Sequence, residues 1–267
     1  MFFKSKLSIF ASTLLVLMSL NVHSTVVEIR TSLGTIEVNL FDNTTPETVA
    51  NFLSYANSGA YASTVVHRSV SNFIVQGGGF QYTGPVAVNS FSLDSISTGT
   101  PVANDPKLSN MRGTIAMAKT SNPDSATSQW FINLSNNANS LDVATNAGGF
   151  TVFGQVVGDG MQVVDAIAAL TLLNGGGAFG ELPIRSYSQA DVDNEVPITD
   201  DNLVVISDIV VTDASADSAA NLNPTLNTLV NTTTGGGGSG ASGGGGAIGW
   251  LLLLGLVMLQ KTWLFKR

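Results

Sequence analysis

The sequence has no cysteine and very little histidine, and both shortages narrow the chemistry open to it. Without a thiolate there is no cysteine nucleophile, no cysteine-ligated zinc and no disulfide to support the fold. Of two histidines, His23 lies in a leader-like segment, so the body holds only His67. One histidine cannot form a metal cluster, and a Ser-His-Asp triad is unsupported because no Gly-x-Ser-x-Gly motif is present. We expect no metal and no cofactor.

Basic residues are also scarce. All 19 acidic residues lie between residues 25 and 246, against six basic residues in the same range. Such an acidic surface repels nucleic acid, so we expect no nucleic-acid partner. The carboxylates are scattered and show no motif for paired acid–base catalysis, which indicates a solvated surface.

Long apolar runs occur only near the two ends. Residues 1–24 carry two lysines, an apolar run from Leu7 to Leu20 and then small residues, the layout of a signal peptide cleaved after Ser24. The alternative is an uncleaved anchor, but the run is short for a membrane span. At the other end, residues 214–246 are rich in Asn, Thr, Ser and Gly and are expected to form a flexible linker. Residues 247–267 are hydrophobic with a basic end, which fits a membrane anchor or a sorting signal with a cytoplasmic C-terminus.

The body, residues 25–213, has the length of one domain and reads mainly as strands. Residues 26–40 alternate apolar and polar side chains around a turn at 32–34, which predicts a hairpin. Helices are predicted from Thr45 to Gly59 and over 160–170, each with one apolar face. Residues 171–202 are predicted to be irregular, and residues 202–213 are predicted to form a closing strand. About eight strands with two helices favour a closed barrel capped by the helices.

The stretch HRSVSNFIVQGGGF, residues 67–80, places Arg68 among apolar neighbours and ends in three glycines. It is not a phosphate loop, because the Gly-Lys-Ser/Thr ending and the following helix are both missing. It is similar to the FHR…F…QGG.F segment of cyclophilin-type peptidyl-prolyl isomerases. Residues 113–134 resemble the G…SMA…SQFFI segment of that family, and residues 141–167 resemble its LD…VFG.V..GM.VVD.I segment. The three segments occur in family order, and the likeness covers about residues 25–212.

This resemblance implies an eight-stranded antiparallel barrel closed by two helices, and cis/trans isomerisation of X–Pro bonds. It makes Arg68 the donor to the twisted amide, with Phe73 and Gln76 as the other catalytic positions. The backbone of Lys119 is expected to pair with an extended substrate. The full set of substrate-binding positions implied is Ile74, Ala118, Lys119, Thr120, Gln129, Phe131, Leu141 and Phe150.

Plainer interpretations of the same residues stay open at this point. Arg68 can be a structural salt-bridge partner, the phenylalanines can be ordinary core, and Gln76 can satisfy a strand end. His67 should point away from Arg68 into the core, as Trp130 should relative to Phe131. For the whole protein, the alternative to an enzyme is a non-catalytic module that holds proline-containing segments at the cell envelope. An adhesin-like surface protein has only the tail in its favour.

The tail resembles a GlyGly-CTERM sorting signal, which implies processing by a rhombosortase-type protease. We therefore expect an exported monomer in the periplasm or at the surface of a Gram-negative bacterium, tethered to the inner membrane at least transiently. The expected partners are proline-containing polypeptides.

Overall fold

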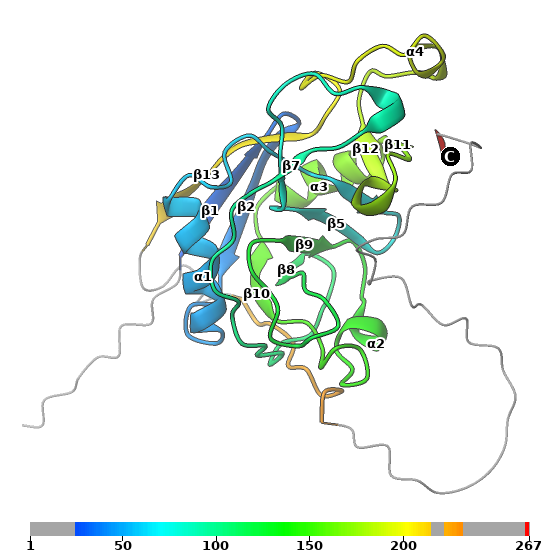
Figure 1. Ribbon diagram of the computed structural model, residues 1–267. Helices are drawn as coiled ribbons and strands as arrows, with labels where there is room; N and C mark the ends of the chain where they lie inside the picture. Colours follow the sequence, from blue (N-terminus) through cyan, green and yellow to red (C-terminus); the bar gives the residue numbers. More distant parts are fainter. Residues whose placement is uncertain (1–24, 215–221, 232–264, 267) are drawn as a thin grey trace, which may run out of the picture.

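The computed structural model describes residues 25–214, 222–231 and 265–266 (Figure 1). One large antiparallel sheet dominates it. In spatial order its strands are β4 (Arg68–Val70), β5 (Ile74–Gly77), β9 (Trp130–Asn133), β8 (Thr114–Met117), β10 (Val152–Val156), β2 (Gly34–Leu40), β1 (Val26–Thr31), β13 (Val205–Asp213), β3 (Thr64–Val65), β6 (Phe80–Gln81) and β7 (Asp94–Ser95). A small sheet contains β12 (Leu182–Ile184), β11 (Thr171–Leu173) and β14 (Phe265–Lys266). The helices are α1 (Pro46–Asn57), α2 (Ala138–Leu141), α3 (Gly160–Ala168), α4 (Gln189–Asp193) and the 3₁₀ turns η1 (Val88–Ser90) and η2 (Gly177–Phe179).

The prediction of a closed barrel is wrong: the strands form an open, strongly curled half-barrel. The reason lies in the segment of residues 64–70, which divides into two strands. Its first part, β3, pairs with β13 and β6, whereas its last part, β4, pairs with β5. β3 and β4 follow one another along the chain without pairing, so the ladder ends at β4 on one side and at β7 on the other.

The predicted hairpin and both predicted helices are present. Val27 and Ile29 of β1 face Val38 and Ile36 of β2 in the antiparallel register, and all four side chains are buried. Helix α1 begins at Pro46, where the missing N–H costs no helical hydrogen bond, and buries Phe52 in the main core. Helix α3 packs mainly against β2 and also contacts β4 and β5.

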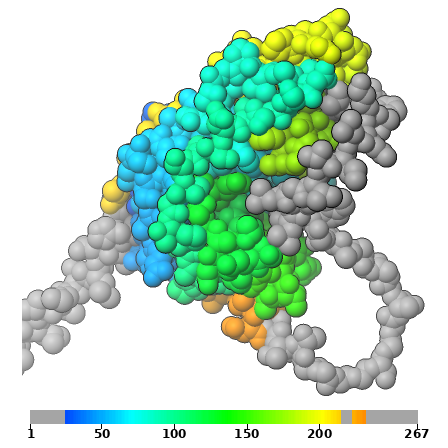
Figure 2. All heavy atoms as spheres, in the orientation of Figure 1, coloured from blue at the N-terminus to red at the C-terminus, as the bar shows by residue number. Residues whose placement is uncertain are grey.

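Residues 171–202, expected to be irregular, contain β11, η2, β12 and α4. They form a second hydrophobic cluster with residues 86–93, in which the rings of Phe91 and Phe179 lie 5.2 Å apart. Figure 2 shows these two regions, cyan and yellow-green, adjoining at the upper part of the molecule. A third cluster includes Ile74, Phe131, Leu141 and Phe150, residues that were expected to bind substrate.

Residues 222–231 fall within the stretch predicted as a linker, and they lie against the domain (orange in Figure 1). We call them the C-terminal strap. The amide of Ser109 donates to the carbonyl of Thr225 (2.8 Å), and the amide of Asn227 donates to the carbonyl of Lys107 (2.8 Å). Leu222 packs on the third cluster. The strap thus adds a short pairing outside the main sheet.

Within the described part of the chain, no helix is long and apolar enough to cross a membrane. The predicted signal peptide, and all but two residues of the predicted hydrophobic C-terminal segment, lie outside the described residues.

Candidate active site

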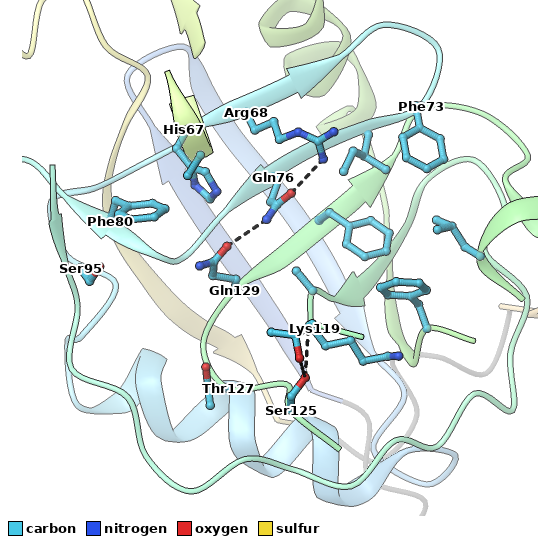
Figure 3. Close-up of a pocket in the computed structure, with 18 residues that line it drawn as sticks. His67, Arg68, Phe73, Gln76, Phe80, Ser95, Lys119, Ser125, Thr127 and Gln129 are labelled. Carbon is cyan, nitrogen blue, oxygen red and sulfur yellow. Dashed lines mark hydrogen bonds between the residues drawn. The ribbon is translucent and has the colours of Figure 1, made fainter. Parts of the chain in front are cut away.

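A cavity of about 680 Å³ opens beside β5 and β9 (Figure 3). Its lining comes from segments far apart in sequence, which the strand order brings together. All eleven residues predicted for the site line it: Arg68, Phe73, Ile74, Gln76, Ala118, Lys119, Thr120, Gln129, Phe131, Leu141 and Phe150. Their chemical roles stay predictions, but their placement in one cavity is a feature of the structure.

The antiparallel register explains why side chains from three neighbouring strands point into the cavity together. Arg68 of β4 lies opposite Gln76 of β5, and Gln76 lies opposite Phe131 of β9. Directly opposed residues in an antiparallel sheet point to the same face, so the guanidinium, the amide and the ring are presented together. Ser69 and Val75 form the next opposed pair in the register and face the other side, where both are buried.

A chain of hydrogen bonds fixes the arginine. The Nη1 of Arg68 donates to the Oε1 of Gln76 (3.4 Å), and the Nε2 of Gln76 donates to the Oε1 of Gln129 (2.9 Å), as the dashed lines of Figure 3 show. On its other side, the Nε of Arg68 donates to Glu181 (3.1 Å). The arginine side chain keeps 21% of its surface exposed. Arg68 is therefore both an ion-pair partner and a wall of the cavity, and its guanidinium is held at two edges.

An apolar slot lies next to these hydrogen-bonded side chains. Ile74, Phe131, Leu141 and Phe150 are buried in one cluster, with Phe73 partly buried against it. The rings of Phe131 and Phe150 meet edge to face, with centroids 5.8 Å apart and an interplanar angle of 71°. The slot is formed by apolar side chains, which suits a small apolar ring such as that of proline.

Lys119 borders the slot and contributes in two ways. Its Nζ lies 4.4 Å from the centroid of the Phe150 ring and donates to the carbonyl of Ala147. Burial lowers the pKa of Lys119 to about 8, although Asp124 acts to raise it. Within the described residues, the backbone N–H and C=O of Lys119 make no hydrogen bond, whereas Ala118 donates to Gln129 and Thr120 donates to Ser125. The main chain at Lys119 is thus open for an added strand.

Sequence reasoning missed several residues of the site. The cavity is also lined by His67, Phe80, Ser95, Ser125, Thr127, Gly177 and Ala178. Glu181, the partner of Arg68, comes from the region read as irregular and was one acid among many. Only its contact across the fold identifies it, and no local pattern marks it.

His67 and Trp130 are buried, as expected from strand alternation. The His67 ring meets Phe80 edge to face, with centroids 4.8 Å apart, and burial lowers its pKa to about 4. His67 therefore stays neutral near pH 7 and is not a cationic group of the cavity. In the part of the chain described, no group of three or more His, Cys, Asp or Glu side chains is placed to hold a metal ion.

Comparison with known proteins points in the same direction as this geometry. A family model described as cyclophilin type peptidyl-prolyl cis-trans isomerase/CLD matches residues 26–188, a range that contains all eleven predicted cavity residues. The peptidyl-prolyl cis-trans isomerase of Acinetobacter baylyi is 44% identical over 147 residues, which cover 54% of this chain and 72% of the relative. Peptidyl-prolyl cis-trans isomerase A of Dickeya dadantii is 46% identical over 155 residues, covering 57% and 76%. Peptidyl-prolyl cis-trans isomerase B of Escherichia coli is 41% identical over 145 residues, covering 53% and 82%.

Proposed function

The chain belongs to the cyclophilin-type peptidyl-prolyl cis-trans isomerases, and on this premise we propose that Arg68 and the apolar slot together rotate X–Pro bonds in exported polypeptides. Isomerase activity itself follows from the family and from its named relatives, and cyclophilins bind proline-containing segments. One observation carries the proposed mechanism: a guanidinium held by two partners lies beside a slot of apolar and aromatic side chains.

The chemistry needs no nucleophile, because no bond is made or broken. Rotation is slow because the twisted amide loses its C–N resonance, which sets a barrier of roughly 18–20 kcal/mol. In the twisted state the nitrogen lone pair becomes available to a hydrogen-bond donor. A guanidinium that binds this state more tightly than the planar amide lowers the barrier.

Each part of the cavity then has a distinct task. The slot of Phe73, Phe131 and Phe150 holds the proline ring, while the free backbone at Lys119 aligns the adjoining peptide. Gln76 holds one edge of the guanidinium toward the slot. Rotation of the bond therefore takes place against a fixed ring and a fixed donor.

Replacement of Arg68 tests the mechanism. Arg68→Ala is expected to lower kcat/KM for an X–Pro test peptide on the order of 100-fold, because one preorganised donor is lost. Arg68→Lys should recover little of this, since an ammonium lacks the fork that Gln76 and Glu181 hold. The measurement is protease-coupled or NMR exchange kinetics on the purified protein.

Arg30→Ala is the matched control. Arg30 is exposed and pairs with Glu28 and Asp208 away from the cavity, so its loss should leave kcat/KM unchanged. Equal activity in wild type and Arg68→Ala would remove Arg68 from its proposed role. If wild type binds proline peptides without accelerating exchange, the non-catalytic binding module is the correct alternative.

We also propose that the protein works outside the cytoplasm, on the strength of the leader-like residues 1–24 and the Gly-rich, hydrophobic, basic C-terminal segment. A cleaved tail would release the domain from the inner membrane, as the likeness to a GlyGly-CTERM signal implies. Mass spectrometry of the protein isolated from its host tests this proposal. Recovery of an intact C-terminal peptide from residues 250–260 would favour a permanent anchor over a sorting signal.

A further inference from the structure

The charge of the cavity is opposite to the charge of the domain around it. Acidic residues outnumber basic ones throughout residues 25–246. Yet among the residues that the structure describes, the charged ones that line the cavity are Arg68 and Lys119, both basic, with no Asp or Glu beside them in the lining. A cationic cavity on an acidic domain discriminates among ligands by charge, because an anion gains an attraction there that the rest of the surface does not offer.

The two cations differ in how far their charge is already compensated. Arg68 forms an ion pair with Glu181 at 3.1 Å. The ion pairs within the described residues involve Arg30, Arg68, Lys107 and Arg112, and none of them includes Lys119. The acidic group that acts electrostatically on Lys119 is Asp124, whose carboxylate accepts the backbone N–H of Asn104 (2.8 Å).

The position of Lys119 puts this charge beside a bound peptide. Its backbone is open to an added strand, and its Nζ lies over Phe150, a wall of the slot. The Nζ donates to a neutral carbonyl, that of Ala147. An ammonium has three N–H donors, so it can keep this contact and still bind a carboxylate.

We propose that Lys119 makes the protein selective for proline segments that carry an acidic side chain within two residues of the proline. This inference rests on the proposed function in taking the cavity as the peptide site. Ion pairs at partly exposed positions contribute little free energy. The preference for Glu over the isosteric Gln should therefore be about three- to fivefold in kcat/KM.

A peptide series tests the proposal. Glu, Gln or Lys is placed in turn at each of the two positions before and the two positions after a single proline, and kcat/KM is divided by the uncatalysed rate of the same peptide. Wild type is expected to favour Glu over Gln at one or more positions and to disfavour Lys there. Lys119→Gln should bring the Glu/Gln ratio to about one, whereas Lys119→Arg should keep it.

Lys107→Gln is the matched control, because it removes one positive charge from the same acidic domain outside the cavity. Its Nζ pairs with Asp105 at 2.8 Å, and its Glu/Gln ratio should equal that of wild type. The proposal is overturned if wild type isomerises the Gln peptides with no preference for Glu at any position. It is overturned as well if Lys119→Gln keeps the wild-type ratio.

Failure of the proposed function would look different. If wild type accelerates none of the peptides, the isomerase mechanism has failed, and the charge preference is then judged from dissociation constants of the same peptides by NMR titration. Tighter binding of the Glu peptides than of the Gln peptides, lost in Lys119→Gln, would support the inference in that case as well. Equal dissociation constants for the Glu and Gln peptides overturn it.

Discussion

At the scale of single residues, the geometry of Arg68 depends on partners from different parts of the chain. Gln76 comes from the neighbouring strand, whereas Glu181 comes from the region before β12. Glu181 is itself held, because its carbonyl accepts the amide of Ser69 at 2.8 Å. In the proposed mechanism Glu181 is therefore a positioning residue, which would act on the substrate only through the guanidinium.

Substitution of Glu181 should lower turnover more than it lowers stability. We expect Glu181→Ala to reduce kcat about three- to tenfold with a smaller change in KM, because the guanidinium loses one of its two restraints. Glu181→Gln keeps a hydrogen-bond acceptor for Nε and should lie between Glu181→Ala and wild type. The measurement is kcat and KM together with urea denaturation.

Glu195→Gln serves as the control, since Glu195 lies in the same half of the chain but contacts Asn89. A fall in activity that merely parallels a fall in denaturation midpoint would show that Glu181 acts on the fold and not on Arg68.

His67 gives the protein a defined sensitivity to acid. Burial lowers its pKa from 6.5 to about 4, and its Nδ1 has no hydrogen-bond partner within the described residues. Between these pH values the unfolded chain binds a proton at His67 that the folded chain does not. The free energy of unfolding is therefore fully retained above about pH 6.5 and falls as the pH drops toward 4, by up to about 3 kcal/mol.

Urea denaturation at several pH values measures this slope in wild type and in His67→Asn. Because His67→Asn also loses packing contacts, its absolute stability is not informative. The quantity to compare is the change in the free energy of unfolding with pH. A variant slope as steep as that of wild type between pH 6.5 and 4.5 would assign the acid sensitivity to other groups.

At the scale of elements, the two glycines that follow β5, Gly78 and Gly79, meet different kinds of neighbour. A Cβ on Gly78 would lie 2.8 Å from the carbonyl oxygen of Ser128, and the residue has φ +78°. A Cβ on Gly79 would instead lie 2.6 Å from the side chain of Gln129. The first neighbour is backbone and cannot give way, but the second is a side chain that can move.

Alanine substitution should separate these two effects. Gly78→Ala is expected to cost about 2–4 kcal/mol of folding free energy, from strain and overpacking. Gly79→Ala should cost about 1 kcal/mol or less. It should nevertheless lower kcat/KM, because Gln129 is pushed away from Gln76.

Thermal denaturation and isomerase kinetics measure these two losses. Gly99→Ala, whose Cβ would lie 3.6 Å from the Tyr55 hydroxyl in ordinary contact, is the control. Equal losses of stability in Gly78→Ala and Gly79→Ala would contradict this assignment.

The elements also show which parts of the fold the sequence can predict. The hairpin of β1 and β2 and the helix α3 follow from apolar periods within a few residues. The break between β3 and β4 at Val66–His67 cannot be predicted in this way. It arises because β3 pairs with β13 whereas β4 pairs with β5. Glu181 was missed for the same reason: its partner Arg68 is more than a hundred residues away, and short Gly-rich segments carry no period. The eleven cavity residues came from ordered family motifs, which summarise such distant contacts.

At the scale of the whole molecule, the C-terminal strap joins the end of the domain to the slot. Asn227 donates through its side-chain amide to the carbonyl of Asp142, the residue after Leu141 of the slot (3.0 Å). Leu222 packs on the cluster that contains Phe131 and Phe150. The strap therefore supports the wall of the slot from behind.

A chain that ends at residue 214 should be less stable than one that ends at residue 231. The expected difference is about 1–3 kcal/mol, from the hydrogen bonds to Lys107 and Ser109 and the burial of Leu222. Urea denaturation of the two chains measures it, and Leu222→Ala in the longer chain isolates the packing part. Coincident unfolding curves for the two chains would show that the strap contributes nothing.

Because the cavity is assembled from distant segments, we expect a peptide bound in the cavity to stabilise the whole folded domain. The cavity is lined by residues of β4, β5, β9 and η2 and by Leu141 at the end of α2, so a peptide bound there would depend on the folded arrangement of all these segments. A ligand that binds only the folded chain adds about 2.7 kcal/mol of stability at a hundred times its dissociation constant. Amide hydrogens remote from the cavity should then exchange more slowly as client concentration rises. At such peptide concentrations the folded chain should be harder to unfold and harder for a protease to degrade.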